Sequence, residues 1–384
     1  MRILHVASFV GNIGDNASHL GLHNILVDYF NHFVVERLEI RKFYKNYKHQ
    51  DKQRFDLSFI EYANQFDLLV IGGGGFLDYW LEGSATGTTI DMEPELVGGI
   101  KVPTLICSVG CIPHKAIPVG NVDKFRRFLD AVMLNTKVRI AVRNDGSILS
   151  LKNNIGAKYL LHIPEVLDNG FFFDTQAAHT LPIENSYIAI NVTDDQLKMS
   201  SYCRGDIDKS VYLAALAYVI THIAKTLNIN VVFVPHIYSD LNAISELFSL
   251  LEDFVIREYI SVAPCLQHDE GAKTVFSVYK NSRLVIGSRF HANVCSLSMG
   301  VPTVGLVALD RVKYVYDQLG MPDSYVLLDY DFRSDLIEKV ENALQQNLEI
   351  KQHLNQELTA RRTFSKDVYF SILDNFGLRT DEEK

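Results

Sequence analysis

The chain is predicted to fold as two α/β domains, each a doubly wound parallel sheet with helices on both faces. Short apolar runs alternate with segments of helical periodicity, which is the pattern of parallel strands joined by helices. At 384 residues the chain is longer than one hydrophobic core usually grows, so about two domains are expected. The periodicity lapses once, near residues 169–185, where the boundary is placed.

The first half begins with a strand, a tight loop and a helix. The apolar run at 2–9 predicts the strand, Gly-Asn-Ile-Gly-Asp at 11–15 the loop, and helical spacing over 16–29 the helix. Further buried strands are expected at 66–71, 104–109 and 138–142. They end respectively at four glycines, at Gly110 and at Arg143.

The second half repeats this alternation. Strands are expected at 187–192, 231–234 and 284–286, and helices at 209–227 and 241–254. Residues 338–375 are polar, helix-prone and poor in glycine, which predicts one or two terminal helices. We therefore expect an N-terminal domain over 1–180, a C-terminal domain over 181–345 and a helical segment over 346–384.

Composition excludes several classes of protein. The chain is 47% hydrophobic and 22% charged, as in ordinary globular proteins, and its net charge of -9 argues against a nucleic-acid partner. The longest apolar stretch, Val211–Ile220, is about half of what a helix needs to cross a bilayer, and the N-terminus lacks a secretion signal. We expect a cytoplasmic protein. Whether it contacts the inner face of the membrane, and in what oligomeric state it exists, stay open from the sequence.

The cysteines predict free thiols. There are five, with no CxxC pair, and the two that precede a histidine by three residues, Cys111 and Cys265, lie in different halves of the chain. No metal site is expected.

The strongest candidate site follows the strand at 284–286. In open parallel sheets, ligands bind beyond the carboxyl ends of the strands, and here Ser288, Arg289, Phe290 and His291 lead into a helix. An Arg can hold a carboxylate or phosphate with two parallel bonds, a helix N-terminus favours anions, and a His can transfer a proton near neutral pH. The alternative is a surface Arg and a packed His at a helix start.

The loop at 11–15 is a second candidate. Its glycines let a ligand approach the backbone, and Asn12 and Asp15 could bond a sugar-like acceptor, with Asp15 able to draw off a hydroxyl proton. Capping of the following helix is the alternative for Asp15. His19 and His23 share a helix face but lack the glutamate of a HExxH zinc motif.

Two further strand-end loops stand out. The glycine run that includes Gly73, Gly74 and Gly75 permits close backbone approach, yet it matches neither GxGxxG nor a P-loop, and a simple turn is the alternative. Arg143 could supply a second cation, although a structural Arg paired with Asp145 fits equally well. The histidines at 114 and 236 occupy comparable loops.

Four motifs in this order resemble the polysaccharide pyruvyl transferase family. They are GNIGD at 11–15, IGGGGFL at 71–77, AVRNDGS at 141–147 and VIGSRFHANVCSLSMGVPTVGL at 285–306, and the resemblance extends over about residues 1–320. The last is the most similar, because the family carries an Arg-aliphatic-His triplet followed by a helix and a G-x-P-x strand. Departures are Phe290 for the aliphatic residue, Asn144 after the Arg, and Asn16 where an acid is common; they bear more on the acceptor than on the donor.

The resemblance implies a GT-B-like fold of two Rossmann-like domains facing a cleft. It also implies transfer of a pyruvyl group from phosphoenolpyruvate to two hydroxyls of a bacterial polysaccharide or its lipid-linked precursor, as a ketal, with no cofactor. The catalytic residues would be Arg289, His291 and Asp15. The donor site would comprise Ser288, Arg289, Phe290, His291 and Arg143, and the acceptor site Asn12, Asp15, Gly73, Gly74, Gly75 and His236.

Two alternatives stay open from the sequence. A GT-B glycosyltransferase would use the same fold, with Arg289 binding the diphosphate of a nucleotide sugar. A binding protein that kept the fold and lost the chemistry would also fit the departures at Asn16 and Asn144.

Overall fold

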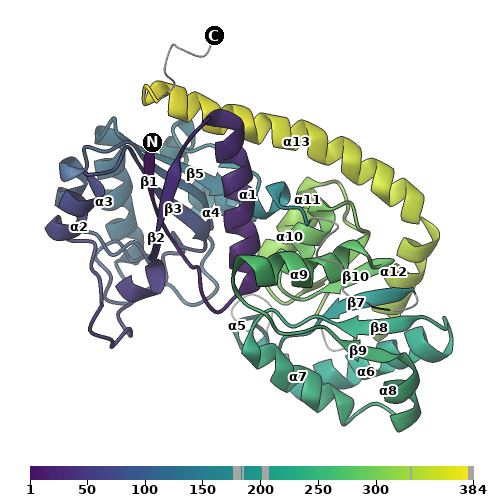
Figure 1. Ribbon diagram of the computed structural model, residues 1–384. Coiled ribbons are helices and arrows are strands. Elements are labelled where there is room, and N and C mark those ends of the chain that lie inside the picture. Colours follow the sequence, from purple (N-terminus) through teal and green to yellow (C-terminus); the bar gives the residue numbers. More distant parts are fainter. Residues whose placement is uncertain (176–182, 184–185, 201–206, 329–330, 379–384) are drawn as a thin grey trace. The chain divides into compact units, whose positions relative to one another are not determined.

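The computed structural model describes residues 1–175, 183, 186–200, 207–328 and 331–378, and its contacts divide the chain into two units (Figure 1). The first unit comprises Met1–Phe9, Leu22–Asn169 and Arg361–Lys384, and the second comprises Val10–Gly21 and Gly170–Ala360. The main division therefore follows Asn169, eleven residues before the expected boundary at 180. Residues 10–21 belong to the second unit, and the expected terminal segment, 346–384, is shared between the two.

The first unit is built on a six-stranded parallel sheet in the order β2-β1-β3-β4-β5-β6. Its strands are β1 (Arg2–Ala7), β2 (Val34–Glu39), β3 (Leu68–Gly74), β4 (Thr104–Val109), β5 (Val138–Arg143) and β6 (Glu165–Val166). The buried strands β3, β4 and β5 are the apolar runs that the sequence predicts. β2 escapes prediction because it is an edge strand whose side chains are all half-buried or exposed.

Helices and single turns connect these strands. The α-helices are α1 (Ile13–Tyr29), α2 (Leu57–Ala63), α3 (Asn121–Leu134) and α4 (Ser147–Ser150). Shorter turns are η1 (Ile40–Phe43), η2 (Pro94–Gly99), η3 (Leu151–Ile155), η4 (Ala157–Leu161) and η5 (Asn169–Phe172). One apolar core, which includes Leu4, Val6, Leu69, Ile71 and Phe125, joins the sheet to α2 and α3.

The second unit contains another six-stranded parallel sheet, in the order β12-β11-β10-β7-β8-β9. Its strands are β7 (Tyr187–Asn191), β8 (Asn230–Phe233), β9 (Ile260–Val262), β10 (Leu284–Gly287), β11 (Thr303–Val307) and β12 (Tyr325–Leu327). Counted along the unit, the order is 6-5-4-1-2-3, which is that of Rossmann domains. The expected fold class, two doubly wound α/β domains, is confirmed.

Helices cover both faces of the second sheet (Figure 1). The α-helices that follow β6 in the chain are α5 (Leu197–Ser200), α6 (Lys209–Lys225), α7 (Tyr238–Phe248), α8 (Asp253–Tyr259), α9 (His268–Lys280), α10 (Phe290–Ser298), α11 (Asp310–Gln318), α12 (Arg333–Gln345) and α13 (Asn347–Asn375). Of these, α6, α7, α8 and α12 contribute to the core on one face of the sheet, and α9 and α10 to the core on the other. Ile188 and Ile190 pack with α6, α7 and α12, whereas Tyr187 and Ala189 pack with α9 and α10, as the two-residue period of a strand requires. Ile13 of α1 packs on the second face.

One expected helix is wrong in extent. Residues 241–254 form parts of two helices, α7 and α8, with a break at 249–252. The apolar spacing continues across that break through Leu250 and Leu251, so periodicity alone does not reveal it.

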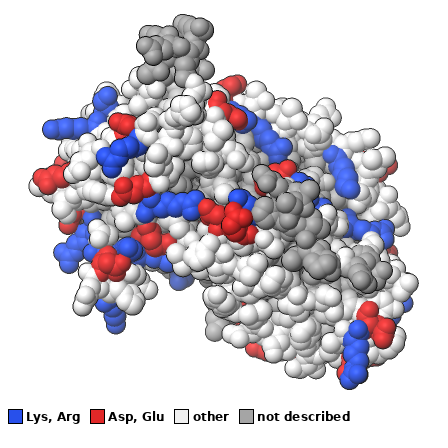
Figure 2. All heavy atoms as spheres, viewed as in Figure 1, with Lys and Arg blue, Asp and Glu red and all other residues white. Residues whose placement is uncertain are grey.

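The surface carries both signs of charge. On the face shown in Figure 2, basic and acidic side chains are interspersed over the described residues. In the described part of the chain, no helix combines the length and apolar character needed to span a bilayer.

Candidate functional site

The carboxyl edge of the second sheet brings the strongest predicted residues together. In a Rossmann order the topological switch point lies between the first and fourth strands, here β7 and β10, and ligands bind beyond their carboxyl ends. β7 ends at Asn191, β10 leads into Arg289 and His291, and the neighbouring β8 leads into His236. We call these four residues, together with Asp15 and Asp240, the switch-point cluster.

Arg289 is held in place by a buried carboxylate. Its Nε donates to Asp240 Oδ2 at 2.9 Å and its Nη2 to Asp240 Oδ1 at 2.6 Å, and Nη2 also donates to Thr193 Oγ1 at 2.9 Å and Asp195 Oδ2 at 3.2 Å. Arg289 is 8% exposed and Asp240 0% exposed. The backbone N–H of Arg289 donates to Asn191 Oδ1 at 2.9 Å, which fixes the start of α10 on the end of β7.

These contacts leave one end of the guanidinium for a ligand. Burial disfavours the charged form, but the hydrogen bonds and charge of Asp240 outweigh it and raise the pKa of Arg289, so the cation is permanent. Within the described residues Nη1 makes no hydrogen bond, and its two N–H groups are available. Asp240 occupies the Nε–Nη2 edge, so an anion held by two parallel bonds would have to be bound at the Nη1 end.

His291 lies in the first turn of α10 against the first turn of α1. Its Nδ1 is 3.9 Å from Asp15 Oδ1, and both side chains are largely buried. A Cβ on Gly14 would lie 2.8 Å from His291 Cβ, so any larger residue at position 14 would displace the imidazole. The second glycine of GNIGD, Gly14, therefore allows α1 to pack closely on His291.

The GNIGD loop belongs to the second unit rather than to the first. Asn12 caps α1, because its Oδ1 accepts from Gly14 N at 3.0 Å. Asp15 is consequently the third residue of the helix and does not occupy its N-cap position. Ile13 N donates to His236 O at 3.4 Å, and Asn16 Nδ2 donates to Asp269 Oδ1 at 3.2 Å.

His236 is buried beside the Arg289–Asp240 pair. Asp240 Oδ2 accepts from His236 N at 2.9 Å, so one carboxylate fixes both the β8 loop and the guanidinium. His236 Nε2 shares a hydrogen bond with Tyr279 Oη at 2.8 Å, while its Nδ1 has no hydrogen-bond partner among the described residues. Burial, assisted by the charges of Arg289 and His291, lowers the pKa of His236 well below its usual value, so it is neutral at neutral pH.

The side chains of Ser288 and Phe290 contact other residues of the second unit. Ser288 Oγ donates to Asn191 O at 2.8 Å and lies 3.1 Å from Tyr212 Oη. Phe290 is 4% exposed, and Arg311 lies over its ring at 5.8 Å from the centroid. Both side chains support the turn into α10, and direct contact with a ligand stays a prediction for both.

Arg143, in the first unit, is enclosed by carboxylates. Its Nε lies 2.6 Å from Asp145 Oδ2 and its Nη1 3.3 Å from Asp168 Oδ2, and all three side chains are buried. Burial opposes the charged form, but the two aspartates outweigh it and raise the pKa of Arg143. The alternative of a structural Arg paired with Asp145 describes this arrangement, and donor binding by Arg143 stays a prediction.

The glycine run is the end of a strand, because β3 continues through Gly74. A Cβ on Gly72 would lie 2.0 Å from Cys107 O, and one on Gly74 would lie 2.5 Å from the Phe76 ring. Gly73 has a φ of 85°, which favours glycine. Packing against β4 and the local turn account for these glycines; acceptor binding by Gly73, Gly74 and Gly75 stays a prediction.

The remaining candidates are the cysteines and His114. Cys107, Cys111 and Cys295 are buried free thiols and Cys265 is a half-buried one, whereas Cys203 lies outside the described residues. His114 is buried in the first unit. Across the described ranges, no three His, Cys, Asp or Glu side chains are arranged to hold a metal ion.

Comparisons with known proteins agree on the fold. The family model for polysaccharide pyruvyl transferase matches residues 12–308. A search of curated proteins gave no match. Among solved structures, a glycosyltransferase from Rickettsia africae is similar with a TM-score of 0.57 at 11% identity, over 98% of this chain and 97% of that one. The UDP-GlcNAc 2-epimerase from Methanocaldococcus jannaschii has a TM-score of 0.55 at 12% identity, over 90% and 93%.

A third similar structure is Anabaena HepE in complex with UDP and glucose, with a TM-score of 0.53 at 11% identity, over 97% of this chain and 99% of that one. At such identities these likenesses establish the fold alone, and they confirm the expected GT-B-like class.

Proposed function

The chain belongs to the polysaccharide pyruvyl transferase family, and we propose that it transfers a pyruvyl group from phosphoenolpyruvate to two hydroxyls of a saccharide. The product would be a cyclic pyruvate ketal and inorganic phosphate. The acceptor would be a bacterial polysaccharide or its lipid-linked precursor, and the reaction as written needs no cofactor.

The reaction requires one proton delivery and two proton removals. A proton added to the methylene carbon turns it into a methyl group and leaves an oxocarbenium-like centre at the neighbouring carbon. One acceptor hydroxyl attacks that carbon and a second closes the ring, while the bond between that carbon and the phosphate oxygen breaks. Of the two hydroxyl protons released, one replaces the proton consumed at the methylene carbon and the other leaves with the phosphate.

The switch-point cluster supplies groups suited to this chemistry. The Nη1 end of Arg289 would bind the phosphate or carboxylate of the donor, with help from the N-terminal end of α10. His291 would deliver a proton or bond the leaving phosphate. Asp15, 3.9 Å from His291 Nδ1, would orient the imidazole and stabilise its protonated form.

The observation that carries the proposal is the two-bond contact between the Asp240 carboxylate and the Nε–Nη2 edge of Arg289. A buried Arg with a buried carboxylate partner is fixed before any ligand arrives, and preorganised cations stabilise charge that develops in a transition state. Because Asp240 takes the Nε–Nη2 edge, the direction of the Nη1 end is set by the protein. This arrangement lies beside an imidazole and a carboxylate, as acid–base chemistry on an anionic donor requires.

The test is an assay with two labelled donors. The purified chain is incubated with phosphoenolpyruvate or with a nucleotide sugar, each with a panel of saccharide and lipid-linked saccharide acceptors. We expect phosphate release from phosphoenolpyruvate together with transfer of its carbon label to an acceptor. Nucleotide release without phosphate release would instead indicate a glycosyltransferase, and phosphoenolpyruvate binding without turnover would indicate a binding protein.

A further inference from the structure

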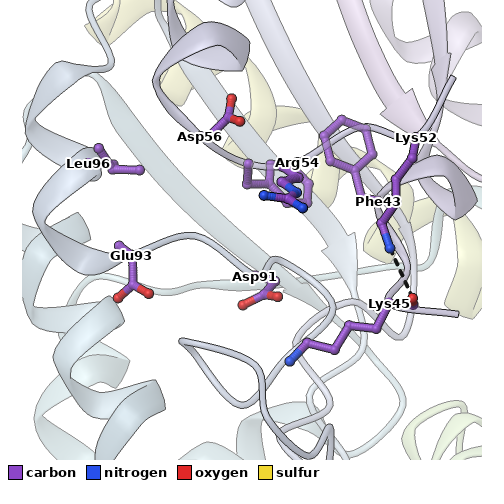
Figure 3. Close-up of a pocket in the computed structure, with 9 residues that line it drawn as sticks. Phe43, Lys45, Lys52, Arg54, Asp56, Asp91, Glu93 and Leu96 are labelled. Atoms are coloured by element: carbon purple, nitrogen blue, oxygen red, sulfur yellow. Dashed lines mark hydrogen bonds between the residues drawn. The ribbon is translucent and has the colours of Figure 1, made fainter. Parts of the chain in front are cut away.

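A pocket of about 460 Å³ lies in the first unit, and none of the site residues assigned above lines it (Figure 3). It is lined by residues of the connection between β2 and β3 and of the connection between β3 and β4. Its volume lies in the range of about 300–1,000 Å³ that small-molecule sites occupy.

Charged side chains of both signs line the pocket in equal numbers. The cations are Lys45, Lys52 and Arg54, and the carboxylates are Asp56, Asp91 and Glu93. In residues 1–175, all of which the structure describes, none of these cations forms an ion pair with any of these carboxylates. Opposite charges around one cavity are therefore held apart, with room for a ligand between them.

Bonds to the backbone hold these groups apart. Lys52 Nζ donates to Lys45 O at 2.9 Å, and Lys45 Nζ donates to Gly83 O (Figure 3 shows the Lys52 bond). Asp91 Oδ1 accepts from Ala85 N at 2.6 Å. A carboxylate and an ammonium that each already bond the chain are positioned before a ligand binds, and they retain capacity for more bonds.

Aromatic packing makes the base of the pocket rigid. Phe43 and Phe55 both line it, and their rings stack at 4.2 Å between centroids. Phe59 packs edge-on against both rings. These aromatic contacts anchor the two ends of the loop at 44–54, which carries Lys45, Lys52 and Arg54.

The equal numbers of cations and carboxylates around the pocket favour a neutral ligand. A polyanion would meet Asp91 and Glu93, and a polycation would meet Lys45 and Arg54, so repulsion disfavours both. A hydroxyl group both donates to a carboxylate and accepts from an ammonium or guanidinium. Several hydroxyls on one rigid ring can thus bridge the separated charges.

We propose that this pocket binds a neutral saccharide of one or two rings. The proposal rests on the proposed function in one respect, since the saccharide would be a sugar of the acceptor other than the one that receives the pyruvyl group. Arg54 and Glu93 are the residues to change, because both are exposed and neither side chain makes a hydrogen bond or ion pair elsewhere in residues 1–175.

The experiment measures binding of the full chain to an array of neutral, anionic and amino-sugar glycans. We expect neutral glycans to bind, and Arg54→Ala and Glu93→Ala each to weaken the affinity by about 10-fold, as loss of a charge-assisted bond does. Lys48→Ala and Glu95→Ala are matched controls, because both side chains are exposed in the same segments but do not line the pocket; they should stay within about twofold.

Three results would overturn the proposal: no neutral glycan binds, charged glycans bind in preference, or binding survives both Arg54→Ala and Glu93→Ala. Phosphate release from phosphoenolpyruvate is measured on the same protein. Glycan binding without phosphate release would reject the proposed reaction and keep the pocket, and the converse would reject the pocket and keep the reaction.

Discussion

Arg289 and Arg143 occupy comparable places in the two units and differ in what surrounds them. Each lies at the carboxyl end of a strand, is nearly buried, and is paired with carboxylates. Asp240 takes one edge of Arg289 and leaves Nη1 available. Arg143 is held from two directions by Asp145 and Asp168, and a Cβ on Gly110 would lie 3.0 Å from its Nη2.

The difference teaches that a strand-end cation is not by itself a ligand site. What decides is how the buried carboxylates hold the guanidinium, which they do along one edge in Arg289 and from two directions in Arg143. By this criterion Arg289 is suited to bind a donor anion, and Arg143 is suited to hold the first unit together. Four predictions can break or sharpen this comparison.

The largest effect is expected for Arg143→Ala. The substitution leaves Asp145 and Asp168 buried without their cation, and breaking a buried ion pair in this way costs about 3–5 kcal/mol. Urea unfolding with hydrogen exchange on β5 would measure the loss in the first unit. A change below about 1 kcal/mol, the scale of an exposed pair, would mean that these charges contribute little to folding.

Arg289→Lys should affect catalysis more than folding. The lysine ammonium keeps the positive charge. It cannot both pair with the Asp240 carboxylate and reach the position that Nη1 occupies in Arg289. We expect kcat/KM for phosphoenolpyruvate to fall, with a loss of transition-state stabilisation of roughly 2–4 kcal/mol. Arg143→Lys is the matched variant and should retain kcat/KM within about threefold; equal losses in both would remove the distinction between the two arginines.

Asp15→Asn should lower kcat about 10- to 100-fold, since it removes the charge that orients His291 and stabilises its protonated form. Asp269→Asn is the control, because Asp269 bonds the neighbouring Asn16. Steady-state rates of both variants are compared at one pH. A wild-type rate for Asp15→Asn would exclude Asp15 from the proton transfers.

The smallest effect is expected in the pH dependence of stability. The pKa of His236 is lowered on folding, so the unfolded chain binds the proton more readily, and the contribution of this residue to stability must fall as pH drops below about 6.5. The slope contributed by this residue is at most about 1.4 kcal/mol per pH unit. His236→Asn should reduce that slope in unfolding measured from pH 7.5 to 5.5; an unchanged slope would show that His236 is not buried neutral.

Much of the fold was accessible from the sequence because its strands are buried on both faces. Such strands read as apolar runs, and the loops after them place Arg289, His291 and His236 at one edge of one sheet. The strand β2 was not accessible, since an edge strand of mixed polarity gives no such run.

The partners of the site residues were not predictable. Asp240 lies in the first turn of a helix, where an acid is ordinary, and nothing local indicates that it will meet an Arg 49 residues later. Similarly, Asp15 follows the first strand of one unit yet packs in the other, because Ile13 and Gly14 bury against His236 and His291. Such contacts depend on tertiary packing, and the local pattern of 11–15 is the same with or without them.

The most direct test of the central claim is calorimetric titration of phosphoenolpyruvate into the wild-type chain, Arg289→Lys and Arg143→Lys. If the Nη1 end of Arg289 binds the donor, Kd should rise about 10-fold or more in Arg289→Lys and stay within about threefold in Arg143→Lys. An Arg289→Lys affinity equal to that of the wild type would contradict the claim that this guanidinium binds the donor.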